Sequence, residues 1–374
     1  MRPAFSSTRQ AAAFAALLLI LLALPLVVKK SWLPSRDQVY AIQNFGLAPL
    51  PYIRQQIFEE KGDIDIAFVG SSHMLHGIDT PYVQQKLSEE LGRPAVVRSF
   101  CWGGPGFDIL YLFTQDLLLH RHVRLLVFYD EDSGKYHSAL IPVLFQYANN
   151  VDLLSGLPVI DKAMFYYAAI RGIPRNLLML CRPEIPAALV SAKPNYSETF
   201  YRSPNPALRL GSISARGGFK LSLTYEDGFP EFVPFTPPAS SLQTGLANFI
   251  CYGPTNQARF NFINPPLPAW QVHFARLFAA LAQTNGCHMV LLHLPVVGQM
   301  RSPVISEREF WPSVMQAPMV VAGIPEGKLF AGLSDSEVLK LFLNPLHLNA
   351  NGEDYFTKCI TPGLMQIYES QINH

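Results

Sequence analysis

The chain has 374 residues, of which 49% are hydrophobic and 15% are charged, enough for one large folded domain or two smaller ones. Its 29 basic and 28 acidic residues leave a net charge of +1, which argues against nucleic acid as a main partner. The 31 prolines and 24 glycines exclude a coiled coil or a simple helical bundle and favour a loop-rich protein.

The cysteines and histidines give no sign of a metal centre. The five cysteines are widely scattered, with neither a CxxC pair nor the spacing of a disulfide framework. Two histidine pairs, His73 with His76 and His120 with His122, have no carboxylate or cysteine at a convincing ligand spacing. We therefore expect no metal and no cofactor.

An uncharged apolar segment covers residues 11–28 (AAAFAALLLILLALPLVV), close to the roughly 20 residues that a helix needs to cross a bilayer. Arg2 and Arg9 precede it, and Lys29 and Lys30 follow it, so the flanking charges do not indicate an orientation. A cleavable signal peptide is the alternative, but the run ends in a poor cleavage site, Leu-Val-Val-Lys-Lys. We expect a single uncleaved membrane anchor, with the main domain outside the cytoplasm, in the periplasm or the extracellular space.

Beyond residue 63, short apolar runs alternate with segments of helical apolar spacing. Strands are predicted at residues 64–69, 95–99, 124–129 and 288–294, and helices from Asp79 to near Gly92, at 107–119, at 270–284 and after Asn349. This alternation predicts an α/β fold, in which a parallel sheet is covered by helices on both faces.

The regular alternation is interrupted by a helical and then Pro-rich stretch, which we interpret as an insertion. The predicted parts are the anchor at 1–30, a tether at 31–62, the α/β domain at 63–133 and 266–374, and the insertion at 134–265. The insertion could form a lid or a wall beside the substrate.

The sequence Gly70-Ser71-Ser72 lies where the first predicted strand meets a helix, at the edge of the sheet where parallel α/β proteins bind ligands. A serine in this turn can simply cap the helix. It can also act as a nucleophile if a histidine serves as its base. His347, just before the last predicted helix, is the candidate for that base.

Three blocks, IAFVGSSHMLHGID, SFCWGGPG and NPLHLNANG, occur in the order found in the SGNH (GDSL-type) esterase family, which the chain resembles. The resemblance implies a flavodoxin-like sheet with Ser72 as nucleophile and His347 as general base. It also implies that the N–H groups of Ser72 and Gly104 form the oxyanion hole, with Gly103 as an alternative to Gly104. Trp102, at the mouth of the site, could stack on a sugar or simply pack in the core.

Two departures from the family pattern concern the groups that support the serine and the histidine. Asn344 stands where the family has an aspartate three residues before its histidine; its carbonyl can accept the Nδ1–H bond but carries no charge. The asparagine expected after the third strand is missing, and Asp130-Glu131-Asp132 occupies that region. Asp130 or Asp132 could instead orient His347 or line the rim of the site, and the alternative is that this acidic cluster is a solvated loop.

The likeness is nearest to membrane-anchored members that work in teichoic acid D-alanyl transfer and polysaccharide O-acetylation. It implies esterase or O-acyltransferase chemistry on a cell-envelope polysaccharide, with a membrane acyltransferase as a possible partner. The alternative is a non-catalytic accessory protein that binds glycan or such a partner. A flavodoxin-like anion binder is a third hypothesis.

Overall fold

The computed structural model describes residues 5–41, 50–102, 106–129, 141–144, 152–181, 228–230, 232–252, 261–262, 267–307 and 314–372. Its contacts divide the chain into two units, which are described separately below. Unit 1 consists of Met1–Gln43 and Ser138–Ser191, and unit 2 of Asn44–His137 and Ala192–His374. Part of the predicted insertion thus belongs with the N-terminal segment, a grouping that the sequence pattern did not suggest.

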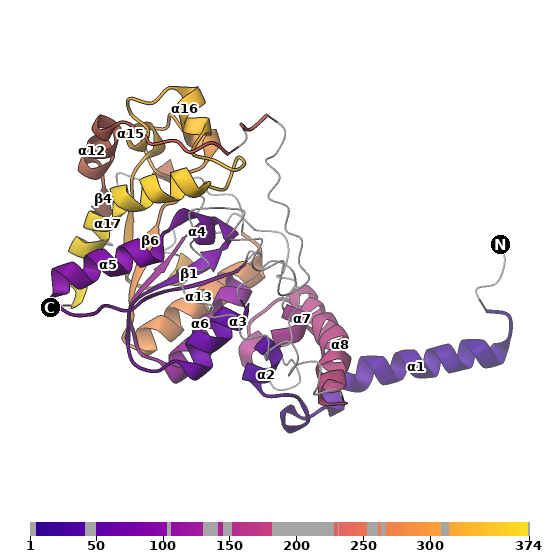
Figure 1. Cartoon of the computed structure of the whole chain (residues 1–374). Coiled ribbons are helices and arrows are strands. Elements are labelled where there is room, and N and C mark those ends of the chain that lie inside the picture. The colour runs from indigo at the N-terminus through magenta and orange to yellow at the C-terminus, as the bar shows by residue number, and fades with distance from the viewer. Residues whose placement is uncertain are drawn as a thin grey trace. The chain divides into compact units, whose positions relative to one another are not determined.

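Unit 2 contains a six-stranded sheet together with the helices that cover it (Figure 1). Its strands are β1 (Ile64–Ser71), β2 (Val97–Trp102), β3 (Val123–Phe128), β4 (Ile250–Tyr252), β6 (His288–Leu292) and β8 (Val320–Gly323), with β5 (Asn261–Phe262) and β7 (Ser306–Glu307) as a separate pair. Its helices are α3 (Leu50–Arg54), η2 (Gln55–Glu59), α4 (Ser72–Gly77), α5 (Thr80–Leu91), α6 (Phe107–His120), α12 (Ala239–Ala247), α13 (Ala269–Thr284), η6 (Val297–Gln299), α15 (Glu326–Leu329), α16 (Asp335–Leu339) and α17 (Ala350–Ile372).

The strand order is β2-β1-β3-β6-β8-β4, and every pairing is parallel except that of the edge strand β4 with β8. The predicted α/β class with a parallel sheet is therefore confirmed. Numbered along the chain, the parallel strands follow the order 2-1-3-4-5, one of the common orders of doubly wound sheets. The order reverses between β1 and β3, so a crevice for a ligand is expected beyond the carboxyl ends of these two strands.

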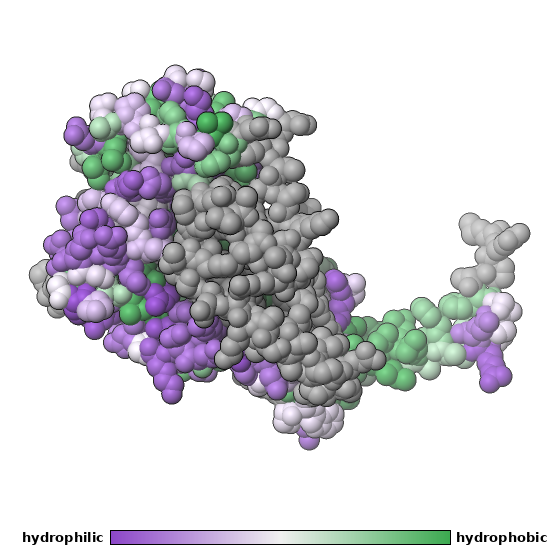
Figure 2. Space-filling view, in the orientation of Figure 1, coloured by the Kyte–Doolittle hydropathy of each residue, from purple (hydrophilic) through white to green (hydrophobic). Residues whose placement is uncertain are grey.

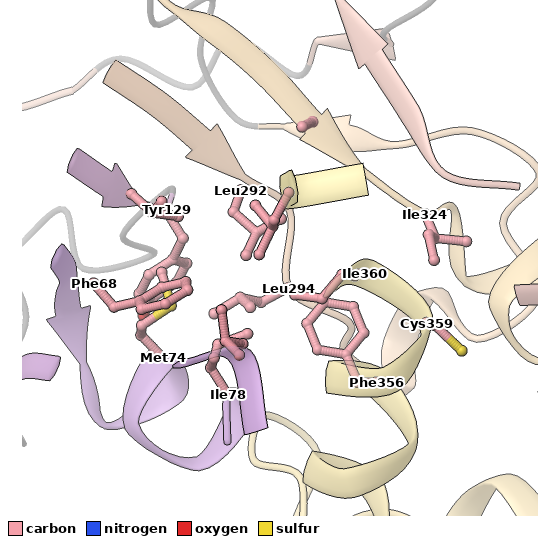
Figure 3. Close-up of a cluster of buried hydrophobic side chains, with 14 of the residues drawn as sticks. Phe68, Met74, Ile78, Tyr129, Leu292, Leu294, Ile324, Phe356, Cys359 and Ile360 are labelled. Carbon is pink, nitrogen blue, oxygen red and sulfur yellow. The ribbon is translucent and has the colours of Figure 1, made fainter. Parts of the chain in front are cut away.

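The strands bury side chains on both faces. On one face, α4, α5 and α17 cover a large hydrophobic core that includes Phe68, Val127 and Leu292 (Figures 1 and 3). On the other face, α6 and α13 pack against each other, and their Phe107 and Phe278 rings contact Phe128 of β3. This burial on both sides explains why the strands are continuous apolar runs instead of alternating ones.

Local signals set the ends of α5. The side chain of Asp79 accepts a hydrogen bond from the Tyr82 N–H at 3.2 Å, and Pro81 lies in the first turn. Gly92 ends the helix with a positive φ of 62°, a backbone conformation that glycine adopts without strain. The predicted start and stop of this helix are both confirmed.

Unit 1 is built from helices. They are α1 (Thr8–Val27), η1 (Lys30–Trp32), α2 (Arg36–Ala41), α7 (Ile141–Leu144), η4 (Asp152–Leu154) and α8 (Val159–Cys181). Among the described residues, α1 alone is long and apolar enough to cross a membrane. Figure 2 shows its surface as almost uniformly hydrophobic up to the polar residues near its N-terminal end.

Candidate active site

Ser72 is the first residue of α4, directly after the carboxyl end of β1. The preceding Ser71 caps this helix, because its Oγ accepts a hydrogen bond from the His73 N–H at 3.2 Å. The turn is tight: a Cβ on Gly70 would lie 2.8 Å from the Met74 Cβ. Ser71 thus fills the capping role that Ser72 could have had, and the Ser72 hydroxyl has a different partner.

That partner is His347, in the loop between α16 and α17. The loop is closed by backbone hydrogen bonds from Leu343 N to His347 O (2.8 Å) and from Asn349 N to Leu341 O (3.0 Å). The Asn349 side chain donates to the carbonyls of Lys340 and Phe342 at 2.8 and 3.2 Å, which holds the two sides of the loop together.

The structure brings Ser72, His347 and Asn344 into one hydrogen-bonded row. The Ser72 Oγ lies 2.9 Å from the His347 Nε2, and the His347 Nδ1 lies 2.9 Å from the Asn344 Oδ1. The same Oδ1 accepts hydrogen bonds from the backbone N–H groups of Leu346 (3.0 Å) and His347 (2.9 Å). Both donors are backbone amides, so the atom that faces the ring must be the oxygen of the Asn344 amide.

This orientation of Asn344 determines the tautomer of His347. A carbonyl oxygen only accepts hydrogen bonds, so the His347 Nδ1 carries the proton in the neutral ring. The Nε2 is then the acceptor, and the Ser72 hydroxyl donates to it. This is the arrangement that a general base needs in order to take the serine proton.

The surroundings keep His347 neutral. Its side chain is half-buried, and burial lowers its pKa below the ordinary histidine value of 6.5. The rings of His73 and His76 lie 6.1 and 5.5 Å from its own. Burial and the neighbouring His347 lower the pKa of His73 to about 3, so His73 adds no second positive charge at neutral pH.

The loop after β6 supports the His347 loop. The Val297 N–H donates to the Pro345 carbonyl at 3.0 Å, two residues before His347. Next to it, the Val296 N–H donates to the Glu326 Oε1 at 3.2 Å, and the other oxygen of this buried carboxylate lies 3.1 Å from the His293 Nε2. A buried polar cluster therefore holds the segment on which the His347 loop rests.

Tyr129, which follows β3, was not among the predicted site residues. Its hydroxyl lies 2.5 Å from the Ser71 Oγ, and its ring packs edge-on against His73, with 5.1 Å between ring centroids. It links the ends of β1 and β3, where the strand order reverses. The sequence signal was a tyrosine at the end of an otherwise aliphatic and phenylalanine run, RLLVFY, which looked like part of the strand.

The remaining predicted residues lie partly or wholly outside the described part of the chain. The backbone of Trp102 pairs with Ser71 at the end of β2, but its side chain is not described. Gly103, Gly104, Asp130 and Asp132 are not among the described residues. Their expected contributions to an oxyanion hole or a substrate rim stay predictions.

In the described ranges, no group of three or more histidine, cysteine or acidic side chains could hold a metal ion. The candidate functional groups in this part of the chain are the Ser72 hydroxyl, the His347 imidazole and the Asn344 amide. Comparisons with known protein families, with curated proteins and with solved structures found no match for this chain.

Proposed function

We propose that the protein is an SGNH-type serine esterase or O-acyltransferase that acts on an acyl ester of a cell-envelope polysaccharide. The observation that carries the proposal is the row of hydrogen bonds from Ser72 through His347 to Asn344, with 2.9 Å at each step. Its direction supports proton transfer from the serine to the Nε2 of the ring. The family resemblance of the three sequence blocks supplies the substrate class.

In the proposed reaction, the Ser72 oxygen attacks the ester carbonyl while its proton moves to the His347 Nε2. The negative charge that forms on the carbonyl oxygen is held by the N–H groups of Ser72 and Gly104. When this intermediate collapses, the alcohol leaves with the proton from His347, and the acyl group stays on Ser72. Water then gives hydrolysis, whereas a sugar hydroxyl gives transfer, and either releases Ser72 with its proton.

The N-terminal segment places this chemistry at a membrane in our proposal. α1 is long and apolar enough to span a bilayer, and nearly all of it is exposed. We propose that it anchors the protein, with unit 2 in the periplasm or outside the cell, where polysaccharide esters and a membrane acyltransferase would be its neighbours.

A fluorophosphonate probe tests the catalytic proposal, because it reacts with a serine only when a base activates the hydroxyl. We expect one labelled site, at Ser72, in the full-length protein. Ser72→Ala should abolish the labelling, and His347→Ala should slow it by at least a hundredfold. Both variants should keep the circular dichroism spectrum of the parent.

His122→Ala is the matched control for the histidine variant, because His122 is 52% exposed and pairs loosely with Asp63 at 3.8 Å. It should label at the parental rate. If the folded parent protein is not labelled, the esterase proposal is wrong, and the non-catalytic accessory role takes its place.

A further inference from the structure

α8 in unit 1 has an exposed face that is mostly apolar. Its exposed positions recur at intervals of three and four residues, which is the spacing of one helix face. They include Ile160, Met164, Tyr167, Arg171, Pro174 and Leu178. Ile160 is 71% exposed, Leu178 60% and Tyr167 54%, so no described residue of unit 1 covers this face.

A different face of α8 holds α1. Ala169 and Ile173 of α8 are buried with Val28 and Leu33, and Leu24 packs against the same cluster. In addition, the Tyr166 hydroxyl donates a hydrogen bond to the Leu22 carbonyl. The contact thus involves the last two turns of α1 and the residues that follow it. Pro25 within these turns is also buried.

These contacts place α8 at a definite level along α1. Leu22 and Leu24 belong to the same apolar helix as Leu19 and Ile20, which are 67% and 62% exposed. Figure 1 shows α8 lying across the C-terminal end of α1. If α1 spans a bilayer, then α8 lies at the depth where the span reaches the membrane surface.

The side chains on the exposed face suit that depth. Tyr167 is an aromatic residue with a polar tip, a type that is enriched where lipid tails meet headgroups. The Arg171 guanidinium lies over its ring, 5.8 Å from the centroid, and can reach the headgroups along its aliphatic stem. Isoleucine, methionine and leucine make up most of the rest of the face.

We propose that α8 is an interfacial helix, whose face of Ile160, Met164, Tyr167 and Leu178 inserts into the bilayer beside α1. The occupant of this face is lipid, and the reason is that α8 packs against the end of α1, a helix whose exposed side chains are mostly apolar. An amphipathic helix lying in the membrane plane buries its apolar side at the boundary of headgroups and acyl chains. The inference rests on the membrane span in the proposed function and does not depend on the chemistry of Ser72.

The test uses the full-length protein in vesicles of phosphatidylethanolamine and phosphatidylglycerol that contain a lipid with a photoreactive diazirine in its upper acyl chain. After illumination, lipid adducts are located by mass spectrometry of peptides. We expect adducts on α1 and on the exposed positions of α8, and at least tenfold fewer on α13 of unit 2. Adducts on α1 without adducts on α8 would overturn the inference while leaving the anchor intact.

A double variant, Ile160→Ser with Met164→Ser, distinguishes insertion from nonspecific labelling. Its adduct yield on α8 should fall at least fivefold relative to that on α1, which serves as the internal reference. Leu246→Ser, at a 38% exposed position of α12, is the matched control and should change neither yield. Equal labelling of α8 in the parent and the double variant would contradict insertion of this face, and absence of adducts from both helices would refute the span itself.

Discussion

His347 is held between a hydroxyl on one side and an amide oxygen on the other. The amide fixes the orientation and tautomer of the ring as well as a carboxylate would, because Asn344 is itself held by two backbone donors. What Asn344 cannot do is stabilise the imidazolium that forms when the ring takes the serine proton. The site therefore combines good geometry with weak electrostatic support.

Asn344→Asp should add that support. In the parent, burial lowers the pKa of His347, so the rate of fluorophosphonate labelling should fall only as the pH drops below 6.5. A carboxylate at position 344 favours the charged ring. The fall in labelling rate at low pH should therefore begin about one pH unit or more higher than in the parent. At higher pH the labelling rate should rise by about tenfold, equivalent to ~1.4 kcal/mol.

The pH dependence of the labelling rate constant, measured for both proteins, checks this prediction. Asn344→Ala is the control that removes the oxygen: it leaves two backbone N–H groups and the Nδ1–H without their acceptor, and it should label more slowly than the parent. If the labelling rate falls at the same pH in the Asp variant and in the parent, residue 344 does not contact the histidine that acts as the base.

At the scale of elements, the His347 loop depends on a close backbone approach. Gly352, in the first turn of α17, has the Leu341 carbonyl so near that an added Cβ would lie 2.0 Å from its oxygen. That oxygen also accepts the hydrogen bond from Asn349 N that closes the loop. Only glycine allows the helix to begin this close to the strand-like segment before the loop.

Gly352→Ala should therefore displace the loop and cost about 1–3 kcal/mol of unfolding free energy, the range typical of overpacked interiors. Because the loop carries His347, the rate of fluorophosphonate labelling should fall as well. Gly298→Ala is the matched control, since a Cβ there would meet no atom within 4 Å. It should stay within about 0.5 kcal/mol of the parent in urea unfolding, and equal stability of both variants would contradict the close approach.

Elements with strong local signals could be predicted from the sequence, and those without could not. The capping Asp79, the stop at Gly92 and the apolar run from Ile64 predicted α5 and β1 well, although β1 continues to Ser71. The four-residue β8 was missed, as was β4, an antiparallel edge strand of three residues. Strands this short depend on pairing with neighbours far along the chain, which no local pattern reveals.

The candidate site could also be predicted only where the sequence carries a strong local signal. Ser72 and His347 were found because each lies in a recognisable sequence block, and the structure brings them within 2.9 Å. Tyr129 and the pair of His293 with Glu326 were not found, since their positions follow from strand order and loop packing. The same holds for the contact of α8 with α1, which joins segments about 140 residues apart.

Across unit 2 as a whole, the candidate site and the ion pair of Asp65 with Arg93 lie at opposite ends of the strands of the sheet. Asp65 is near the start of β1, and Ser72 follows its end, about 23 Å away for an extended strand of this length. The buried Asp65 carboxylate accepts hydrogen bonds from Arg93 (2.6 and 3.1 Å), from the Tyr368 hydroxyl (2.6 Å) and from the Val96 N–H (2.8 Å). It thereby joins β1, the entry to β2 and the end of α17.

Asp65→Asn should lower stability without impairing Ser72. Burial alone would raise the pKa of Asp65, but the hydrogen bonds outweigh it, and the folded-state pKa lies below 3.8. Its ionised form therefore stabilises the fold above about pH 4, and this contribution is lost as the pH falls through the folded-state pKa. In urea unfolding at pH 7 we expect a loss of about 2–3 kcal/mol of unfolding free energy, shrinking towards pH 3.

The matched control is Asp354→Asn at an exposed position, which only breaks a pair with Lys358 and should cost at most about 0.5 kcal/mol. Fluorophosphonate labelling per folded molecule should match the parent, and a large loss of labelling in Asp65→Asn would show that the two ends of the strands are coupled.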